Sequence, residues 1–162
     1  MKGKVKTMPN TVNKIQSFTV NHNTLTEGIY ISRIDRGIVT YDLRTRKPNM
    51  GDYMDNVTMH TLEHMFATYI RNSDIADSVL YFGPMGCQTG FYLLVADDIT
   101  PQKVYDTTVS VLNKIIDHEG AVFGASAIEC GNYRSLDLGA AVNEAHRYLR
   151  VLESNPVPDF KY

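Results

Sequence analysis

The residues best suited to chemistry are two histidines and a glutamate within residues 59–65, arranged as His-x-x-Glu-His. On an α-helix, residues four positions apart lie on the same face, so His60 and His64 can bind one metal ion. Glu63 lies between them, where it could move a proton for whatever group the metal activates. The segment therefore predicts a metalloenzyme.

A metal ion held by two histidines needs a further protein ligand. Carboxylates are common candidates, but Cys130, in the turn-like sequence Cys130-Gly131-Asn132, supplies a softer sulfur that suits a zinc-like ion. Two histidines, this cysteine and a water molecule would form an open, catalytic site. The sequence therefore favours Cys130 as the third ligand.

Cys87 lies in a shaped loop, because residues 83–90 contain three glycines and a proline. Three interpretations remain open for this side chain. It could be a small buried residue, the fourth ligand of a closed structural site with two cysteines and two histidines, or an acid/base group beside an open metal site. Sequence spacing does not decide among them.

A second kind of enzyme also fits the pattern. In a metallopeptidase, Glu63 would activate water, and a downstream carboxylate such as Glu144 would replace Cys130 as a ligand. Several other polar residues could be ordinary strand, loop or surface groups, and their pattern alone assigns them no function: Ser17, His22, Arg44, His118 and His146.

The metal motif requires a helix that directs the histidines away from the core. Helical periodicity over residues 57–72 places Leu62 and Met65 on a broad apolar face. His60 and His64 project from the opposite side. The histidines are therefore not needed for packing.

Further elements must surround this helix. Two more helices are expected, one from Pro101 towards Gly120 and one over residues 138–152. Strands are expected over residues 15–20, 29–34, 38–45, 79–82 and 90–96. Polar and apolar residues alternate along 38–45, which predicts a half-buried antiparallel strand with one polar face.

Size and composition are those of one soluble globular domain. The 162 residues are 43% hydrophobic and 21% charged, and we expect a loose N-terminal arm over 1–14 and a tail over 155–162. A net charge of -2 gives no reason to expect nucleic acid or an anionic membrane as a partner. No apolar run approaches about 18 residues, and the start lacks the apolar stretch of a signal peptide. Two cysteines fit a reducing cytoplasm.

Five segments in register resemble the S-ribosylhomocysteine lyase (LuxS) family. They comprise residues 17–22, 41–49, 60–64, 83–94 and 129–133. Among them are the sequences Ser-Phe-Thr-Val-Asn-His, His-Thr-Leu-Glu-His and Pro-Met-Gly-Cys-Gln-Thr-Gly-Phe-Tyr. The resemblance extends from about residue 13 to residue 152 and is far more specific than the metal motif alone.

The resemblance implies an α+β fold, in which an antiparallel sheet is flanked by helices in a two-layer domain. It implies a homodimer with active sites at the interface. It also implies one divalent metal ion per subunit, with iron(II) expected and zinc possible, held by His60, His64 and Cys130.

In the family that the chain resembles, the metal assists cleavage of S-ribosylhomocysteine by carbonyl migration and β-elimination. The products are homocysteine and 4,5-dihydroxy-2,3-pentanedione, the precursor of autoinducer-2, which links the activated methyl cycle to quorum sensing. The resemblance implies that Glu63 and Cys87 are the catalytic acid/base groups. It implies that Ser17, His22 and Arg44 shape the substrate pocket.

One segment departs from the family pattern. Before Pro-Met-Gly-Cys the family carries Asp-Ile-Ser, whereas this chain has Tyr81-Phe82-Gly83. A substrate contact made by that aspartate in relatives is therefore not expected here.

Overall fold

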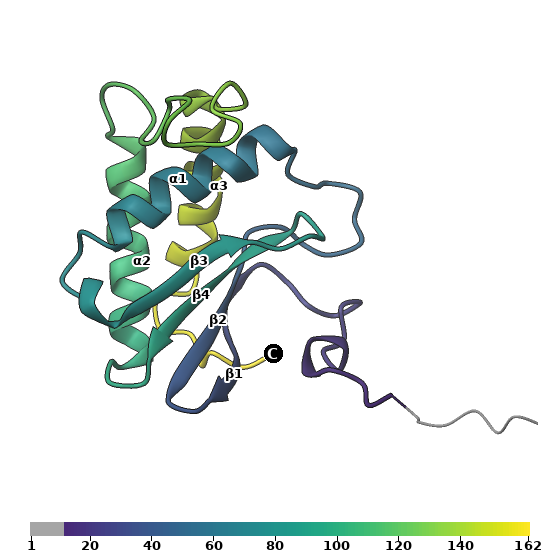
Figure 1. The fold of residues 1–162 in the computed structure, drawn as a ribbon. Coiled ribbons are helices and arrows are strands. Elements are labelled where there is room, and N and C mark those ends of the chain that lie inside the picture. Colours follow the sequence, from purple (N-terminus) through teal and green to yellow (C-terminus); the bar gives the residue numbers. More distant parts are fainter. Residues whose placement is uncertain (1–11) are drawn as a thin grey trace, which may run out of the picture.

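A four-stranded antiparallel sheet and three α-helices form two layers in the computed structural model, which describes residues 12–162 (Figure 1). The strands are β1 (Gly28–Asp35), β2 (Ile38–Arg44), β3 (Val79–Pro84) and β4 (Gly90–Ala96), in the sheet order β1-β2-β4-β3. The helices are α1 (Asn56–Ile70), α2 (Pro101–Ile116) and α3 (Leu138–Glu153), with short 3-10 helices η1 (Gln16–Phe18) and η2 (Ala76–Ser78). The α+β architecture implied by the sequence is confirmed.

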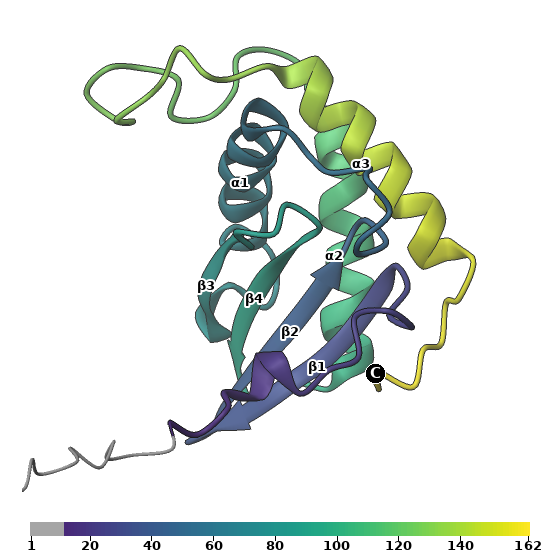
Figure 2. The same ribbon diagram turned by 90° about the vertical axis from the view of Figure 1, so that its right-hand side faces the viewer.

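The helices cover one face of the sheet, and the segment that contains η1 lies against the other face (Figures 1 and 2). After α3, the chain returns along β1 to the C-terminus (Figure 2). The first eleven residues of the expected N-terminal arm lie outside the described residues. None of the helices formed by residues 12–162 has the length and apolar character that a membrane crossing requires.

Local sequence explains where the helices begin. Asp55, Thr100 and Asp137 each accept a hydrogen bond from a backbone N–H in the first turn of α1, α2 and α3, respectively. Pro101 occupies the start of α2, where its missing N–H is not needed. The predicted helices are therefore confirmed to within two residues at these starts.

Packing of aromatic rings joins α1 to the sheet. The Phe66 ring stacks on Phe82 of β3 with centroids 4.3 Å apart, and Phe82 stacks on Phe91 of β4 at 5.0 Å. Met65 and Leu62 beside this stack are buried. The apolar face of α1 is thus committed to the core, as its periodicity predicts.

Two predictions about the strands are wrong. Residues 15–20 form no strand, because backbone and Thr19 hydroxyl bonds to the carbonyl of Gln16 close the short helix η1 instead. Strand β2 is not half-buried, because both of its faces are covered and Asp42 and Arg44 on its polar face are buried. The alternating pattern identified an antiparallel strand but not the chain segments that cover its second face.

Gly90 provides a test of the sheet, because it faces Arg44 where β2 and β4 approach closely. A methyl group at Gly90 would lie 2.6 Å from the carbonyl oxygen of Leu43, and backbone atoms cannot swing away as a flexible side chain can. We expect Gly90→Ala to lower the free energy of unfolding by about 1–3 kcal/mol. Chemical denaturation measures this change. Gly86→Ala is the control, because a methyl group there meets no atom within 4 Å; equal stability of both variants would contradict the expectation.

Candidate functional site

Two turns of α1 and the loop before α3 bring three potential metal ligands together. The ligand atoms of His60, His64 and Cys130 all lie within 4.8 Å of one another, and all three residues are half-buried. The His60 Nε2 and Cys130 Sγ atoms are 3.3 Å apart. Among residues 12–162, these side chains form the one group of three or more histidine, cysteine or acidic residues that converges in this way.

Backbone carbonyls fix the orientation of both imidazole rings. His60 Nδ1 donates a hydrogen bond to the Ser135 carbonyl at 2.9 Å, and His64 Nδ1 donates to the Phe123 carbonyl at 2.7 Å. A ring that donates through Nδ1 keeps the lone pair of Nε2 for a metal. Both rings are therefore held in the tautomer that metal binding requires.

Gly124 allows the loop of residues 121–129 to approach His64. Its φ angle is +67°, and a methyl group there would lie 3.1 Å from His64 Nδ1. Glycine adopts this conformation at low cost and leaves room for the imidazole. The loop can thus place the Phe123 carbonyl against the ring.

The donor set fits a divalent transition metal. Atoms that share one tetrahedral ion with bonds of about 2.0–2.3 Å lie about 3.3–3.7 Å apart, close to the His60–Cys130 separation. Two imidazoles and one thiolate suit iron(II) or zinc better than magnesium or calcium, which prefer oxygen. Three protein ligands leave a position open for substrate.

Glu63 shares a cavity with one of these ligands. It lies on α1 and, with His60 and Asn132, lines a cavity of about 390 Å³. Pro84, at the end of β3, lines this cavity and also the cavity that contains Cys87. His60 and Glu63 therefore line a cavity that is next to the cavity of Cys87.

Cys87 is exposed on the loop between β3 and β4. It lines a cavity of about 340 Å³ together with Ser17, His22 and Arg44. The structure thus brings Cys87, which the resemblance implies is catalytic, together with the three residues that the resemblance assigns to the substrate pocket. They come from the N-terminal segment, β2 and the β3–β4 loop.

Arg44, which lines this cavity, forms a buried ion pair with Asp42. Arg44 Nη2 lies 2.5 Å from Asp42 Oδ2, and Arg44 Nη1 lies 2.6 Å from Thr89 Oγ1 and 3.7 Å from Cys87 Sγ. Burial alone would lower the pKa of Arg44, but the neighbouring Asp42 carboxylate raises it above its ordinary value. Arg44 therefore remains a cation beside the sulfur.

Burial also raises the pKa of Asp42 above its ordinary value, while Arg44 and the hydroxyl of Tyr162 oppose that shift. The carboxylate is 0% exposed, so its charge depends on these two partners. Asp42 thus connects the cysteine cavity to the C-terminal residue.

The positions of Cys87 and Glu144 do not fit the two alternative metal sites, the closed structural site and the peptidase site. Cys87 is not among the converging ligand atoms, so a closed site with two cysteines and two histidines does not form. Glu144 is buried and bound by Arg46, with Oε2 2.7 Å from Nη2, so it is not placed as a metal ligand for a peptidase.

His118 was expected at the surface, but it is half-buried, with Nδ1 2.7 Å from the Tyr69 hydroxyl.

Sequence reasoning missed the residues that support the site. Asp42 carries a detectable signal, because a charge two positions before Arg44 on one strand lies on the same face. The carbonyls of Phe123 and Ser135 carry none, since any residue supplies a carbonyl. At the segment that departs from the family pattern, the Tyr81 ring covers the position where Gly83 has no side chain.

Comparison with known proteins gives a consistent result. The family model described as S-Ribosylhomocysteinase (LuxS) matches residues 15–157. The S-ribosylhomocysteine lyase of Desulfotalea psychrophila is 42% identical over 147 residues, which cover 88% of this chain and 92% of that protein. The enzyme of the same name from Borreliella burgdorferi strain ZS7 is 38% identical over 154 residues, covering 92% and 98%. That from Finegoldia magna is 40% identical over 147 residues, covering 88% and 94%.

The two cysteines should differ in metal binding. We expect Cys130→Ala to lose nearly all bound metal, because two imidazoles alone hold a divalent ion weakly. Cys87→Ala should retain as much metal as the unaltered protein. Metal analysis of gel-filtered protein measures both. Loss of metal from both variants would instead indicate that Cys87 is a ligand.

Proposed function

Because the chain belongs to the S-ribosylhomocysteinase (LuxS) family, we propose that it cleaves S-ribosylhomocysteine to homocysteine and 4,5-dihydroxy-2,3-pentanedione. One observation carries the proposal beyond the family match. The group of His60, His64 and Cys130 is accompanied by a separate cavity with an exposed cysteine beside a fixed arginine. A peptidase needs no such second group, whereas repeated proton transfer on carbon does.

The first proposed role is metal binding. His60, His64 and Cys130 would hold one divalent ion per chain, and we expect iron(II), with zinc as a possible substitute. When bound, such an ion supplies Lewis-acid polarisation of a substrate carbonyl, which acidifies the neighbouring C–H bond.

The second proposed role is proton transfer by Cys87 and Glu63. In the open-chain sugar, each carbonyl shift removes a proton from one carbon and returns a proton to its neighbour, so no proton is consumed. Two shifts move the carbonyl from the first to the third carbon. The carbon–sulfur bond is then β to the carbonyl. A base removes the proton from the fourth carbon, the carbon–sulfur bond breaks, and the homocysteine sulfur takes up a proton. The enol that remains moves its hydroxyl proton to the terminal carbon and becomes the dione. Two bases on different segments can serve opposite faces of the sugar.

The third proposed role is substrate binding. Arg44 offers a fixed positive charge, and Ser17 and His22 offer polar groups in the same cavity. Since Arg44 is held by Asp42 and Thr89, little conformational entropy is lost when it binds a substrate oxygen. We assign these three residues to substrate positioning.

We further propose that two copies of the chain form a homodimer that closes the site. The helices cover only one face of the sheet (Figures 1 and 2). Large apolar side chains remain exposed, including Phe18 of η1 at 65% and Tyr81 of β3 at 51%. The cysteine cavity is bordered by Phe18, so a partner that covers this residue would also exclude water from the cavity. Two free cysteines in such a site require a reducing compartment, and we assign the chain to the cytoplasm.

Release of free thiol from S-ribosylhomocysteine by metal-loaded, anaerobically purified protein tests the reaction. We expect Glu63→Gln and Cys87→Ala each to lower kcat by about 10²–10⁴-fold, because each removes a proton-transfer group. Both variants should keep their metal. Absence of thiol release from the metal-loaded protein, or hydrolysis of peptides instead, would contradict the proposed lyase activity.

Sedimentation equilibrium tests the assembly. We expect a dimer, and we expect Tyr81→Asp to weaken it because a buried charge without a partner is costly. Val157→Asp is the matched control, since Val157 is 78% exposed and lies outside the sheet. A monomeric protein with full activity would refute the shared site.

A further inference from the structure

The last residues of the chain lie beyond the family match, which ends at residue 157, yet they are placed on the sheet. The backbone N–H of Ile31 in β1 donates a hydrogen bond to the Phe160 carbonyl at 2.8 Å. The Phe160 ring meets the Tyr41 ring edge-on, with centroids 6.4 Å apart. The tail therefore extends the free edge of β1 and is anchored by one ring on the helix-covered side.

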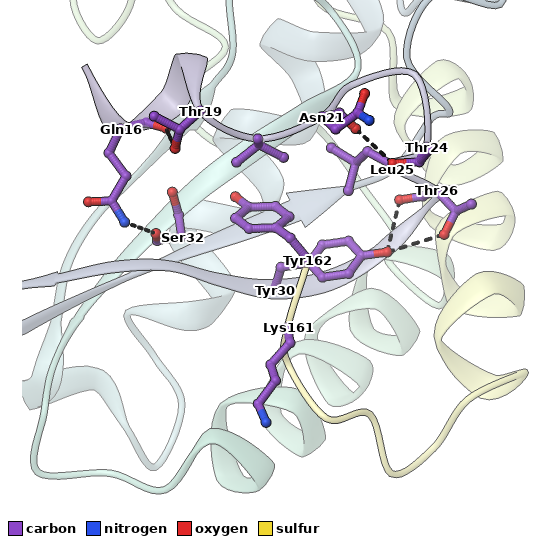
Figure 3. A pocket seen from close by; sticks show the side chains of 11 residues that line it. Gln16, Thr19, Asn21, Thr24, Leu25, Thr26, Tyr30, Ser32, Lys161 and Tyr162 are labelled. Atoms are coloured by element: carbon purple, nitrogen blue, oxygen red, sulfur yellow. Dashed lines mark hydrogen bonds between the residues drawn. The ribbon is translucent and has the colours of Figure 1, made fainter. Parts of the chain in front are cut away.

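Tyr162 reaches the other side of the sheet. Its ring stacks on Tyr30, with centroids 5.1 Å apart and planes at 19° (Figure 3). Its hydroxyl donates a hydrogen bond to Asp42 Oδ2 at 2.9 Å. The same oxygen accepts the bond from Arg44 Nη2. The C-terminal residue thus shares one carboxylate oxygen with the arginine of the cysteine cavity.

A short series of contacts joins this hydroxyl to Cys87. Arg44 binds Asp42 through Nη2 and reaches Thr89 and Cys87 through Nη1. Thr89 Oγ1 lies 3.1 Å from Cys87 Sγ. Within residues 12–162, Asp42 Oδ1 and Arg44 Nε are buried without a hydrogen-bond partner, so the ion pair has few other bonds to hold its orientation.

We propose that Tyr162 is a positioning residue, whose hydroxyl fixes the Asp42–Arg44 pair in the orientation that directs Arg44 at Cys87. The inference rests on the proposed function, in which Cys87 transfers protons and Arg44 binds substrate. Without the Tyr162 hydroxyl, the buried Asp42 carboxylate would have one hydrogen-bond donor fewer and would attract Arg44 more strongly. The Arg44 guanidinium would then lie closer to Asp42 and farther from Cys87.

The surroundings of the two groups favour a permanent hydroxyl donor. Burial raises the pKa of Tyr162 well above its ordinary value, so the hydroxyl stays protonated. His22 is the second basic side chain near the sulfur, since it lines both cavities that border Cys87. The other polar side chains that line these cavities carry no positive charge, and they are Ser17, Asn49, Tyr53, Thr89 and Tyr92, so Arg44 is the fixed cation that faces the sulfur.

Tyr162→Phe removes only the hydroxyl and keeps the stacked ring. Lys161→Ala is the matched control, because the Lys161 side chain leaves the same tail in a direction away from the tyrosine pair (Figure 3). Iodoacetamide alkylation of Cys87, followed by peptide mass spectrometry on metal-loaded protein, reports the sulfur directly from about pH 6 to about pH 9. Thiol release from S-ribosylhomocysteine reports kcat and KM for the same samples.

We expect Tyr162→Phe to slow alkylation of Cys87 at neutral pH by about three- to tenfold and to displace its pH profile upward, because the nearby cation is partly withdrawn. We expect kcat to fall by a similar factor and Lys161→Ala to match the unaltered protein. An unchanged alkylation profile in Tyr162→Phe, even with a lowered Tm, would overturn the proposal and leave the tail a purely structural role. If the unaltered protein releases no thiol, the proposed function fails, while the alkylation profiles still decide the role of Tyr162.

Discussion

The packing of α1 against β3 and β4 is the constraint on which the rest of the structure depends. The helix must bury one face in the core and keep the histidine face available, and the stack of Phe66, Phe82 and Phe91 fixes its rotation. Each buried aromatic ring contributes about 1.5–3 kcal/mol through the area removed from water. A rotation of α1 that moved the histidines would break this stack, so the core itself orients these potential metal ligands.

The ion pair of Asp42 and Arg44 imposes a second constraint on the sheet. Both side chains are almost completely buried, at 0% and 2% exposed. Desolvation of two charges offsets most of their attraction, so such a pair contributes little net stability. Its effect at this position is geometric, since it holds a cation 3.7 Å from the sulfur of an exposed cysteine. The cover that β2 receives from Tyr162 on this face is therefore part of the site.

Sequence patterns predicted the helices, four of the strands and the three potential metal ligands, because periodicity and ligand spacing are local properties. They failed at residues 15–20, where turn hydrogen bonds decide the structure and the apolar content does not. They also failed on the second face of β2, since its cover comes from the far end of the chain. Gly124 could not be assigned a role, because its effect on His64 depends on a contact across 60 residues.

The cavity of Glu63 and the cavity of Cys87 share a lining residue, and both depend on the packing of β3 against α1. Phe82 of β3 stacks on α1, and Pro84, two residues later, lines both the cavity of Glu63 and the cavity of Cys87. Strand β3 buries the Phe82 ring, and its Pro84 borders both cavities. A shift of β3 along its axis would therefore change the shape of both cavities. The proposed reaction needs its two proton-transfer groups at a constant separation while the carbonyl moves along the sugar. If Glu63 and Cys87 transfer protons as proposed, the α1–β3 contact holds both residues in place relative to His60, His64 and Cys130.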